Sequence, residues 1–384
     1  MKIRARDSRF LVWPFAYFLL HGAAYPQELP TLQLKNTEVR LLRGIPDEPI
    51  TGPIRCDNAG NIYLRTYQHP DPLAAPVRRF TQEGKRLPEL SLMKSDEFKD
   101  KRYQIKDFQT GLAGHTFVLV GSTRKDEDGQ DFGPVEVSVV DFDESGKPGT
   151  RTKLDVSPDF MARQLGVFPD GKFVVGGLKH VRGPGYVPQN GVPEPEVYIA
   201  SFNQDGHLIA EFHPTPSPAE ETAAETHDAE KTAETSTQQK QSNAKESWSG
   251  KGPAPEDMVV GQDGNAYFFH KGAIPVIYVL SENGEFARQF FVPLPSLNAR
   301  PWHVRSLPGL KLLVVFIEDV SEDPTDGQVQ YLDIIDSQSG ETISPYKLLP
   351  RDGGIFACFS EPYDFVFLGG DPQGFTTIVH ASPK

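Results

Sequence analysis

The strongest constraint on the fold is a two-part signal that recurs along the chain. Its first part is a turn containing Gly or Pro, followed by an apolar strand. Copies lie at Asp57–Leu64, Phe168–Val175 and Gly261–Phe268, with weaker copies at Leu112–Leu119, Leu307–Val314 and Ser360–Phe367. The second part, an apolar strand running into a polar turn with Gly, ends at Phe80–Gly84, Phe142–Gly146, Phe202–Gly206, Leu280–Gly284 and Ile335–Gly340. Asp, Asn and Gly suit such hairpin turns because they tolerate positive φ.

Two hairpins per repeat correspond to four antiparallel strands, which is one blade of a β-propeller, and the first part of the signal occurs six times. Successive first-turn glycines are about 45–60 residues apart with one exception, as is typical of propeller repeats. The sequence therefore predicts an all-β, six-bladed β-propeller of four-stranded antiparallel blades. A β-sandwich or an open array of hairpins is the alternative. The even repeat and the lack of a helical period favour the closed ring.

The exceptional spacing, between Gly171 and Gly264, coincides with a compositionally biased segment. Residues 213–255 are rich in Pro, Ala, Glu, Thr, Ser and Gln and contain no Leu, Ile, Val or Phe. Such a segment cannot bury enough apolar surface to offset its ordering entropy. We expect a disordered insertion at 213–255 within a single propeller domain spanning residues 25–384.

The last repeat supplies only about three strands before Lys384. The early segment Thr31–Leu42 has strand character and belongs to no repeat of its own. We expect it to form the missing outer strand of blade six, closing the ring with an N-terminal strand and covering an exposed sheet edge.

Residues 1–24 have the layout of a secretory signal peptide. Four basic residues lie within the first nine positions, the apolar run Phe10–Leu20 follows, and small residues occupy positions 22–24. The run is too short for a stable membrane anchor, which needs about 20 apolar residues. An uncleaved anchor is the alternative interpretation. We expect the mature chain to lie outside the cytoplasm, periplasmic or secreted, without membrane insertion.

The formal net charge is −13. An acidic surface repels phosphate backbones and anionic lipid, so nucleic acid is a poor candidate partner.

The turns at Asp57–Leu64, Phe168–Lys172 and Gly261–Asn265, with their Phe-x-x-x-Gly partners, resemble those of six-bladed propellers of the NHL and TolB-like kind over residues 31–384. These are motifs of a fold that hosts both enzymes and binding proteins, so the resemblance implies no activity.

In such a ring the tight glycine turns lie on one face, and the longer connections lie on the other. Long connections are expected at Gly121–Pro134, Gly177–Glu196 and Glu318–Gln328. Long loops on a rigid scaffold are a common binding arrangement. Neutral drift of loop length is the alternative.

Several residues are expected near that face. Arg163, Asp257, Trp302 and His303 should lie on inner strands at the channel mouth, and His69, His180 and His270 should lie close by. Imidazoles, a guanidinium and a carboxylate around one opening suit an anionic or metal-linked ligand. Each residue taken singly also fits an ordinary loop position.

The segment Asp126–Asp131 carries carboxylates around a glycine, with Asp126, Asp128 and Asp131 as candidate calcium ligands. It lacks the later Glu of a full calcium loop, and an ordinary acidic loop is the alternative.

No Gly-x-Ser-x-Gly or His-Glu-x-x-His motif is present. The sequence therefore favours a non-catalytic propeller that binds a protein, peptide or glycan through its long-loop face. A metal-dependent hydrolase or lactonase with its site at the channel mouth is the alternative.

Cys56 and Cys358 are the only two cysteines. They precede the first turns of blades one and six, which a closed ring makes neighbours. A disulfide between them and a pair of buried free thiols are both consistent with the sequence, and an oxidising compartment favours the bond.

Overall fold

The computed structural model describes residues 40–41, 50–57, 59–66, 74–110, 114–125, 131–157, 159–180, 195–214, 254–271, 275–319, 328–348, 354–360, 364–370 and 376–381. Within these residues the regular structure is almost entirely β, with two single-turn 3-10 helices, η2 (Leu92–Lys94) and η3 (Asp96–Phe98). Neither of these described helices has the length or apolar character to cross a membrane.

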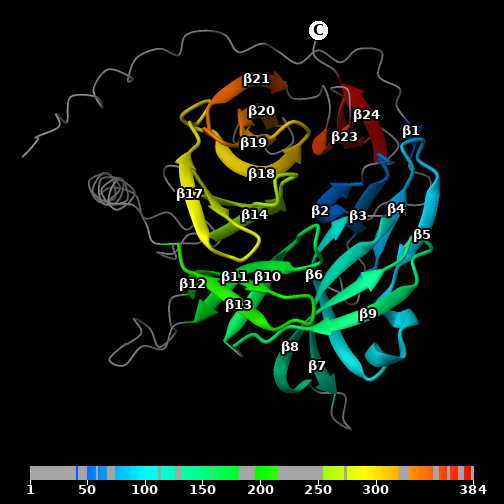
Figure 1. Cartoon of the computed structure of the whole chain (residues 1–384). Helices are drawn as coiled ribbons and strands as arrows, with labels where there is room; N and C mark the ends of the chain where they lie inside the picture. The colour runs from blue at the N-terminus through cyan, green and yellow to red at the C-terminus, as the bar shows by residue number, and fades with distance from the viewer. Residues whose placement is uncertain are drawn as a thin grey trace, which may run out of the picture.

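The strands form six four-stranded antiparallel sheets arranged as the blades of a ring (Figure 1). Blades 1 to 3 are β2 (Ile50–Cys56), β3 (Ile62–Thr66), β4 (Val77–Phe80), β5 (Arg86–Leu90); β6 (Lys101–Thr110), β7 (Thr116–Lys125), β8 (Asp131–Phe142), β9 (Pro148–Lys153); and β10 (Phe160–Val167), β11 (Phe173–His180), β12 (Pro195–Phe202), β13 (Leu208–Phe212). Blades 4 to 6 are β14 (Ala254–Val260), β15 (Ala266–Lys271), β16 (Val276–Leu280), β17 (Phe286–Phe291); β18 (Arg300–Leu307), β19 (Lys311–Asp319), β20 (Gln328–Asp336), β21 (Thr342–Leu348); and β22 (Ile355–Ser360), β23 (Asp364–Gly370), β24 (Thr376–Ala381), β1 (Arg40–Leu41). The six-bladed propeller predicted from the repeats is confirmed.

Glycine at the tight turns gives each blade its hairpins. In blade 3, Gly171 and Gly206 have φ of 84° and 86°, a region that side chains with a Cβ rarely adopt. The first and third turns of a blade lie at one end of its sheet. The second turn and the connection to the next blade lie at the other end, which we call the long-loop face.

Six apolar clusters hold the ring together, one at each junction between neighbouring blades. The cluster that joins the first blade to the last contains Ile54, Leu64 and Phe80 from blade 1 with Val366 and Ile378 from blade 6. Alternate residues of each strand supply these clusters, since side chains of a strand point to opposite faces and both faces of a blade meet a neighbour.

The seam between blades 1 and 6 carries the disulfide that the sequence left open. Cys56 and Cys358 are bonded, with their Cα atoms 5.8 Å apart. At the outer edge of blade 6, β1 pairs with β24 through Arg40 opposite Ile378. The remainder of Thr31–Leu42 lies outside the described residues, as does the predicted signal segment 1–24, so closure of the ring by an N-terminal strand stays a prediction.

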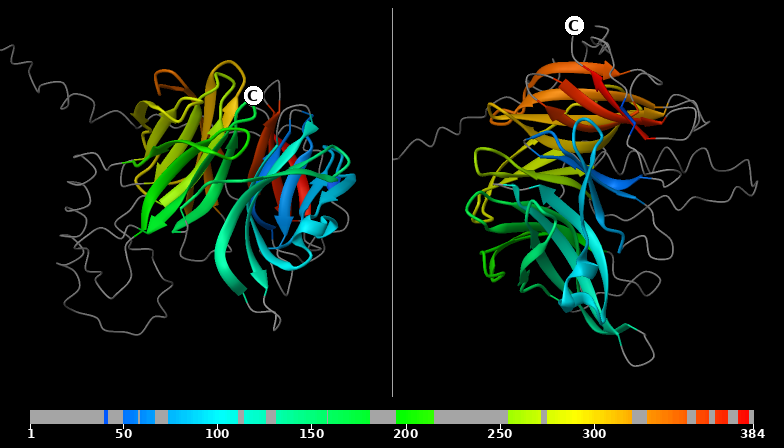
Figure 2. Two further views of the ribbon diagram at one scale, coloured as in Figure 1. Left: turned by 60° about the horizontal axis from the view of Figure 1, so that its bottom comes forward. Right: turned by 90° about the vertical axis from the view of Figure 1, so that its right-hand side faces the viewer.

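The prediction of a long loop at Gly121–Pro134 is wrong for most of that segment. β7 continues to Lys125 and β8 begins at Asp131, because Lys125 and Asp131 still pair in the ladder. The two strands, ten and twelve residues long, carry blade 2 beyond the other blades (Figures 1 and 2). Most of the predicted insertion 213–255 lies outside the described residues, although Ala254 and Pro255 begin β14.

Removing the disulfide should destabilise the protein through the seam. We expect the double variant Cys56→Ser/Cys358→Ser to lose about 2–5 kcal/mol of unfolding free energy, since the bond links residues 302 positions apart. Denaturant unfolding of oxidised, reduced and variant protein measures the loss. Reduced wild type should match the variant, and equal stability of variant and oxidised wild type would contradict the prediction.

A lone buried carboxyl lies at the junction of blades 4 and 5. Asp333 on β20 is 4% exposed, its Oδ1 has no hydrogen-bond partner, and its cross-strand neighbour Val314 belongs to the apolar cluster there. Burial raises the pKa of Asp333 to about 7. The folded protein therefore holds this proton at pH values where the unfolded chain has released it.

This carboxyl should make stability fall as the pH rises. Between the unfolded pKa near 4 and the folded pKa of about 7, wild type should lose on the order of 4 kcal/mol that Asp333→Asn does not lose. Unfolding free energies of both proteins from pH 4 to 8 test this. Parallel pH profiles would show that Asp333 ionises normally in the fold.

Candidate binding site

The first strand of every blade lines the axis and carries a bulge at a similar height. The register shifts in β2, β6, β10, β14, β18 and β22. In blades 2 to 6 the residues left unpaired by these shifts are Lys106, Arg163, Glu256, Trp302 and Ala357. A bulge turns its extra residue away from the regular alternation of the strand. The ring thus places unlike side chains at equivalent positions on the side of the long-loop face.

The residue after the bulge is an aspartate in blades 2 and 4, and both carboxylates are used in the same way. Asp107 accepts hydrogen bonds from its neighbour Phe108 N, at 2.8 Å, and from Leu165 N of the next blade, at 2.8 Å. Asp257 accepts from Met258 N, at 2.9 Å, and from Val304 N of blade 5, at 3.3 Å. Each carboxylate therefore ties the bulge of its own strand to the first strand of the following blade.

Two arginines extend this network across the axis. Arg55 of blade 1 donates to both carboxylate oxygens of Asp107, at 2.9 and 3.1 Å, and its guanidinium lies 3.8 Å from Asp257 of blade 4. Blades 1 and 4 stand opposite each other in a six-membered ring. Arg305 of blade 5 pairs with Asp257 and donates to the carbonyl of Ile54 at 3.2 Å. Side chains therefore fill the axis at this level.

Asp257 also orients His303, which lies nearer the long-loop face. Burial alone would raise the pKa of Asp257, but Arg305, His303 and Arg55 together hold it well below its usual range. The ionised carboxylate accepts the Nδ1 proton of His303 at 2.9 Å. Burial, followed by the charge of Arg305, lowers the pKa of His303 to about 4, against the opposing effect of Asp257. The His303 imidazole is therefore neutral at neutral pH, and its Nε2 atom is left as a hydrogen-bond acceptor.

Four of the predicted residues lie where first strands bulge, and contacts join three of them, Asp257, His303 and Trp302. Arg163, Trp302, Asp257 and His303 all lie on first strands at the bulges, as the sequence placed them. Arg163 is exposed, and the His303 side chain is 21% exposed. Trp302 is half-buried and contacts both the His303 ring and the apolar cluster between blades 5 and 6.

The other predicted residues are placed differently or lie outside the described part of the chain. His270 on β15 is 5% exposed and packs against Tyr278, and burial lowers its pKa to about 4. His180 and Asp131 end and begin strands, and their side chains are not described; His69, Asp126 and Asp128 lie outside the described residues. Within the described side chains, no group of three His, Cys, Asp or Glu could hold a metal ion. The calcium site stays a prediction.

Sequence reasoning missed Lys106, Asp107 and the two arginines, Arg55 and Arg305. The signal was present in the repeat, because Lys106, Arg163 and Glu256 each stand about eight residues before the turn glycine of their blade, the offset of the bulge. Superposing the repeats on that glycine would have placed Lys106 beside Arg163.

Comparisons with known proteins add little to this geometry. No family model and no curated protein matches the chain. Among solved structures, a Bacteroides caccae protein of unknown function is 11% identical with a TM-score of 0.43, covering 79% of this chain and 88% of its own. A Synechocystis apocarotenoid oxygenase is 12% identical with a TM-score of 0.40, and the match spans 80% of this chain and 64% of the oxygenase. A luciferin-regenerating enzyme is 12% identical with a TM-score of 0.32, covering 75% of this chain and 92% of its own. None of these similarities transfers an activity.

Breaking the axial network of buried ion pairs should lower the free energy of unfolding substantially. Asp257→Asn removes the charge that compensates two buried guanidiniums, and we expect it to lower the unfolding free energy by about 3–5 kcal/mol. The control Asp319→Asn breaks an exposed pair with Arg300, 3.0 Å long, and should cost less than about 1 kcal/mol. Denaturant unfolding compares the two, and similar losses would show that the network contributes no more than a surface pair.

Proposed function

We propose that this is an exported, non-catalytic propeller that binds a protein, peptide or glycan over the ring axis on its long-loop face. The observation that carries the proposal is the set of bulges. They offer the cationic side chains of Lys106 and Arg163, the indole of Trp302 and the acceptor Nε2 of His303 around one axis. Few, well-placed polar groups beside an aromatic surface are typical of ligand sites.

The base of this site is built to stay in place. Arg55, Asp107, Asp257 and Arg305 are paired with one another and almost fully buried beneath the bulges. A rigid base lowers the entropy lost when a ligand is bound, which favours affinity without movement of the scaffold. This network holds side chains that face the ligand and does not itself contact it.

Export is supported by two independent features. The first 24 residues combine a basic start with an apolar run, and Cys56 and Cys358 form a disulfide. Disulfides persist in oxidising compartments and are rare in the cytosol. The resemblance of the turns to NHL and TolB-like propellers belongs to the same proposal, as the finer class within the six-bladed fold.

A second candidate function, a hydrolase at the same mouth, is favoured by the Asp257–His303 pair. A carboxylate that holds the Nδ1 proton leaves Nε2 as a base, the arrangement by which many hydrolases activate a hydroxyl or a water. The metal-dependent form of this hypothesis needs further ligands, and Glu256 at the β14 bulge is the nearest carboxylate in sequence.

The binding proposal predicts that ligand retention depends on the bulge residues. Arg163→Ala and Trp302→Ala should each lose most binding to glycan arrays and to partners from an envelope extract. Arg86→Ala on the outer strand β5, whose side chain is exposed, should bind as wild type does. Melting curves confirm that each variant is folded, which matters for Trp302 because it packs against a core cluster.

Equal retention by wild type and both bulge variants would contradict the binding face. If the retained ligand is instead cleaved on incubation, and His303→Gln binds without cleaving it, the hydrolase function replaces the binding one. Metal analysis of the same preparation, purified without chelator, then distinguishes the metal-dependent form from a His303-based one.

A further inference from the structure

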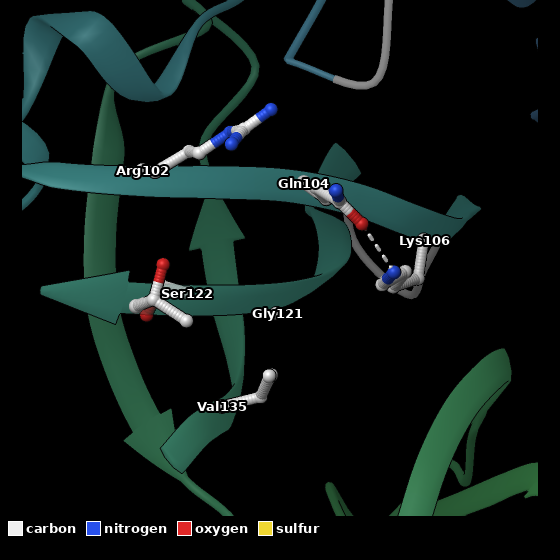
Figure 3. A pocket seen from close by; sticks show the side chains of 7 residues that line it. Arg102, Gln104, Lys106, Gly121, Ser122 and Val135 are labelled. Carbon is white, nitrogen blue, oxygen red and sulfur yellow. Dashed lines mark hydrogen bonds between the residues drawn. The ribbon is translucent and has the colours of Figure 1, made fainter. Parts of the chain in front are cut away.

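Blade 2 carries a cavity where it projects beyond its neighbours on the long-loop face. Its volume is about 140 Å³. The lining residues come from three adjacent strands (Figure 3). They include Arg102, Gln104 and Lys106 of β6, Gly121 and Thr123 of β7, and Val135 of β8. No residue predicted from the sequence belongs to it, and it lies on the opposite face of β6 from Tyr103 and Ile105, which pack into the core cluster between blades 1 and 2.

The absence of a side chain at Gly121 keeps the cavity open. Gly121 pairs with Gln104 in the ladder, at the centre of the lining. A Cβ at this position would stand 3.2 Å from Lys106 Cε and 3.4 Å from Val135 Cγ1. The methyl of an alanine would already touch both walls, and a valine would occupy the space between them.

The cavity gathers positive charge in an acidic protein. Lys106 Nζ donates to Gln104 Oε1 at 2.6 Å, and within the described part of the chain Lys106 makes no ion pair with a carboxylate. Burial, and then the like charges of Arg163 and Arg65, lower the pKa of Lys106. The whole chain has a formal net charge of −13, yet the charged groups that act on Lys106 are the cations Arg163 and Arg65. Such crowding disfavours the empty site and favours an anion in it.

The remaining lining indicates which kind of anion fits. Gln104 and Thr123 supply uncharged donors and acceptors. A carboxylate can accept from their N–H and O–H groups, and ring hydroxyls can in addition donate to their oxygens. An ionised phosphate ester offers acceptor oxygens only, so it would use the cations and the N–H and O–H donors but leave the acceptor oxygens of Gln104 and Thr123 without a donor. A sugar acid offers one carboxylate for Lys106 and Arg102 and several hydroxyls for Gln104 and Thr123.

We propose that the blade 2 cavity binds the carboxylate of an acidic sugar, a uronate unit of a glycan. The proposal deepens the proposed binding function, on which it rests, by naming the ligand class and a subsite beside the axial mouth. The uronate carboxylate lies between Lys106 and Arg102, and the rest of the glycan continues toward Arg163 and Trp302 at the bulges.

The test is calorimetric titration of the full-length disulfide-bonded protein with defined small probes. D-Glucuronate and D-galacturonate should bind, with affinity that falls as salt rises. D-Glucose, N-acetylglutamate and inorganic phosphate should bind at least about tenfold more weakly. Tighter binding of N-acetylglutamate would indicate an acidic peptide, tighter binding of phosphate a phosphorylated ligand, and either result overturns the sugar acid.

Variants locate the site. Lys106→Gln and Arg102→Gln should each weaken uronate binding by about tenfold or more, as loss of a charge-assisted hydrogen bond does. Lys106→Gln should also raise the melting temperature of the ligand-free protein, because it removes a like charge from beside Arg163 and Arg65. Gly121→Val should abolish binding by filling the cavity. Lys147→Gln, an exposed lysine in the tight turn of the same blade, is the charge-matched control and should change neither property.

The experiments distinguish failure of the cavity proposal from failure of the proposed binding function at the axial mouth. If an oligouronate loses affinity with Trp302→Ala but not with Arg102→Gln or Gly121→Val, the axial mouth binds and the cavity does not. If single uronates bind wild type and Trp302→Ala equally and Arg102→Gln poorly, the cavity proposal stands. Arg102 is exposed, so Arg102→Gln keeps the test decisive even if another variant fails to fold.

Discussion

The buried ion pairs between blades, one of which crosses the axis, constrain the rest of the structure near the axis. Arg55 of blade 1 reaches both Asp107 of blade 2 and Asp257 of blade 4, and Arg305 of blade 5 closes the set. Charges this deeply buried are costly unless each is compensated. Each blade must therefore keep its position for the others to be tolerated. The same carboxylates bind backbone N–H groups of the next blade, so bulge, axis and ring geometry are coupled.

Around this axis the ring is held by surface complementarity between blades. Each junction has its own apolar cluster, so no single hydrophobic core serves the whole chain. The junction between blades 1 and 6 joins segments far apart in sequence, and closing it costs the most chain entropy. It is also where the disulfide stands. The axial network reaches blade 1 beside this seam, where Arg305 of blade 5 donates to the carbonyl of Ile54.

In the proposed binding site on the long-loop face, the arrangement that suits a ligand opposes stability. Lys106 is held beside Arg163 and Arg65 without a carboxylate partner in the described structure, an arrangement that disfavours the unliganded protein. Groups arranged for a ligand commonly cost stability in its absence. The buried network beneath shows the opposite arrangement, in which every arginine has an acidic partner. This contrast distinguishes the residues that hold the scaffold from Lys106, which we propose binds an anion.

The sequence by itself determined the blade count and the tight turns. Glycines that can adopt positive φ and alternating apolar residues are local signals, and they recur within each repeat. It also placed Arg163, Asp257, Trp302 and His303 on first strands, from their offsets to those turns. Only the tertiary structure decided that Asp257 meets Arg55 from the opposite blade, that Cys56 bonds Cys358, and that the segment after Gly121 continues as strand around a cationic cavity. The first two features arise from contacts between residues distant in the chain, which no local pattern encodes. The third is a local hairpin ladder, in which Lys125 pairs with Asp131 where the sequence suggested a loop.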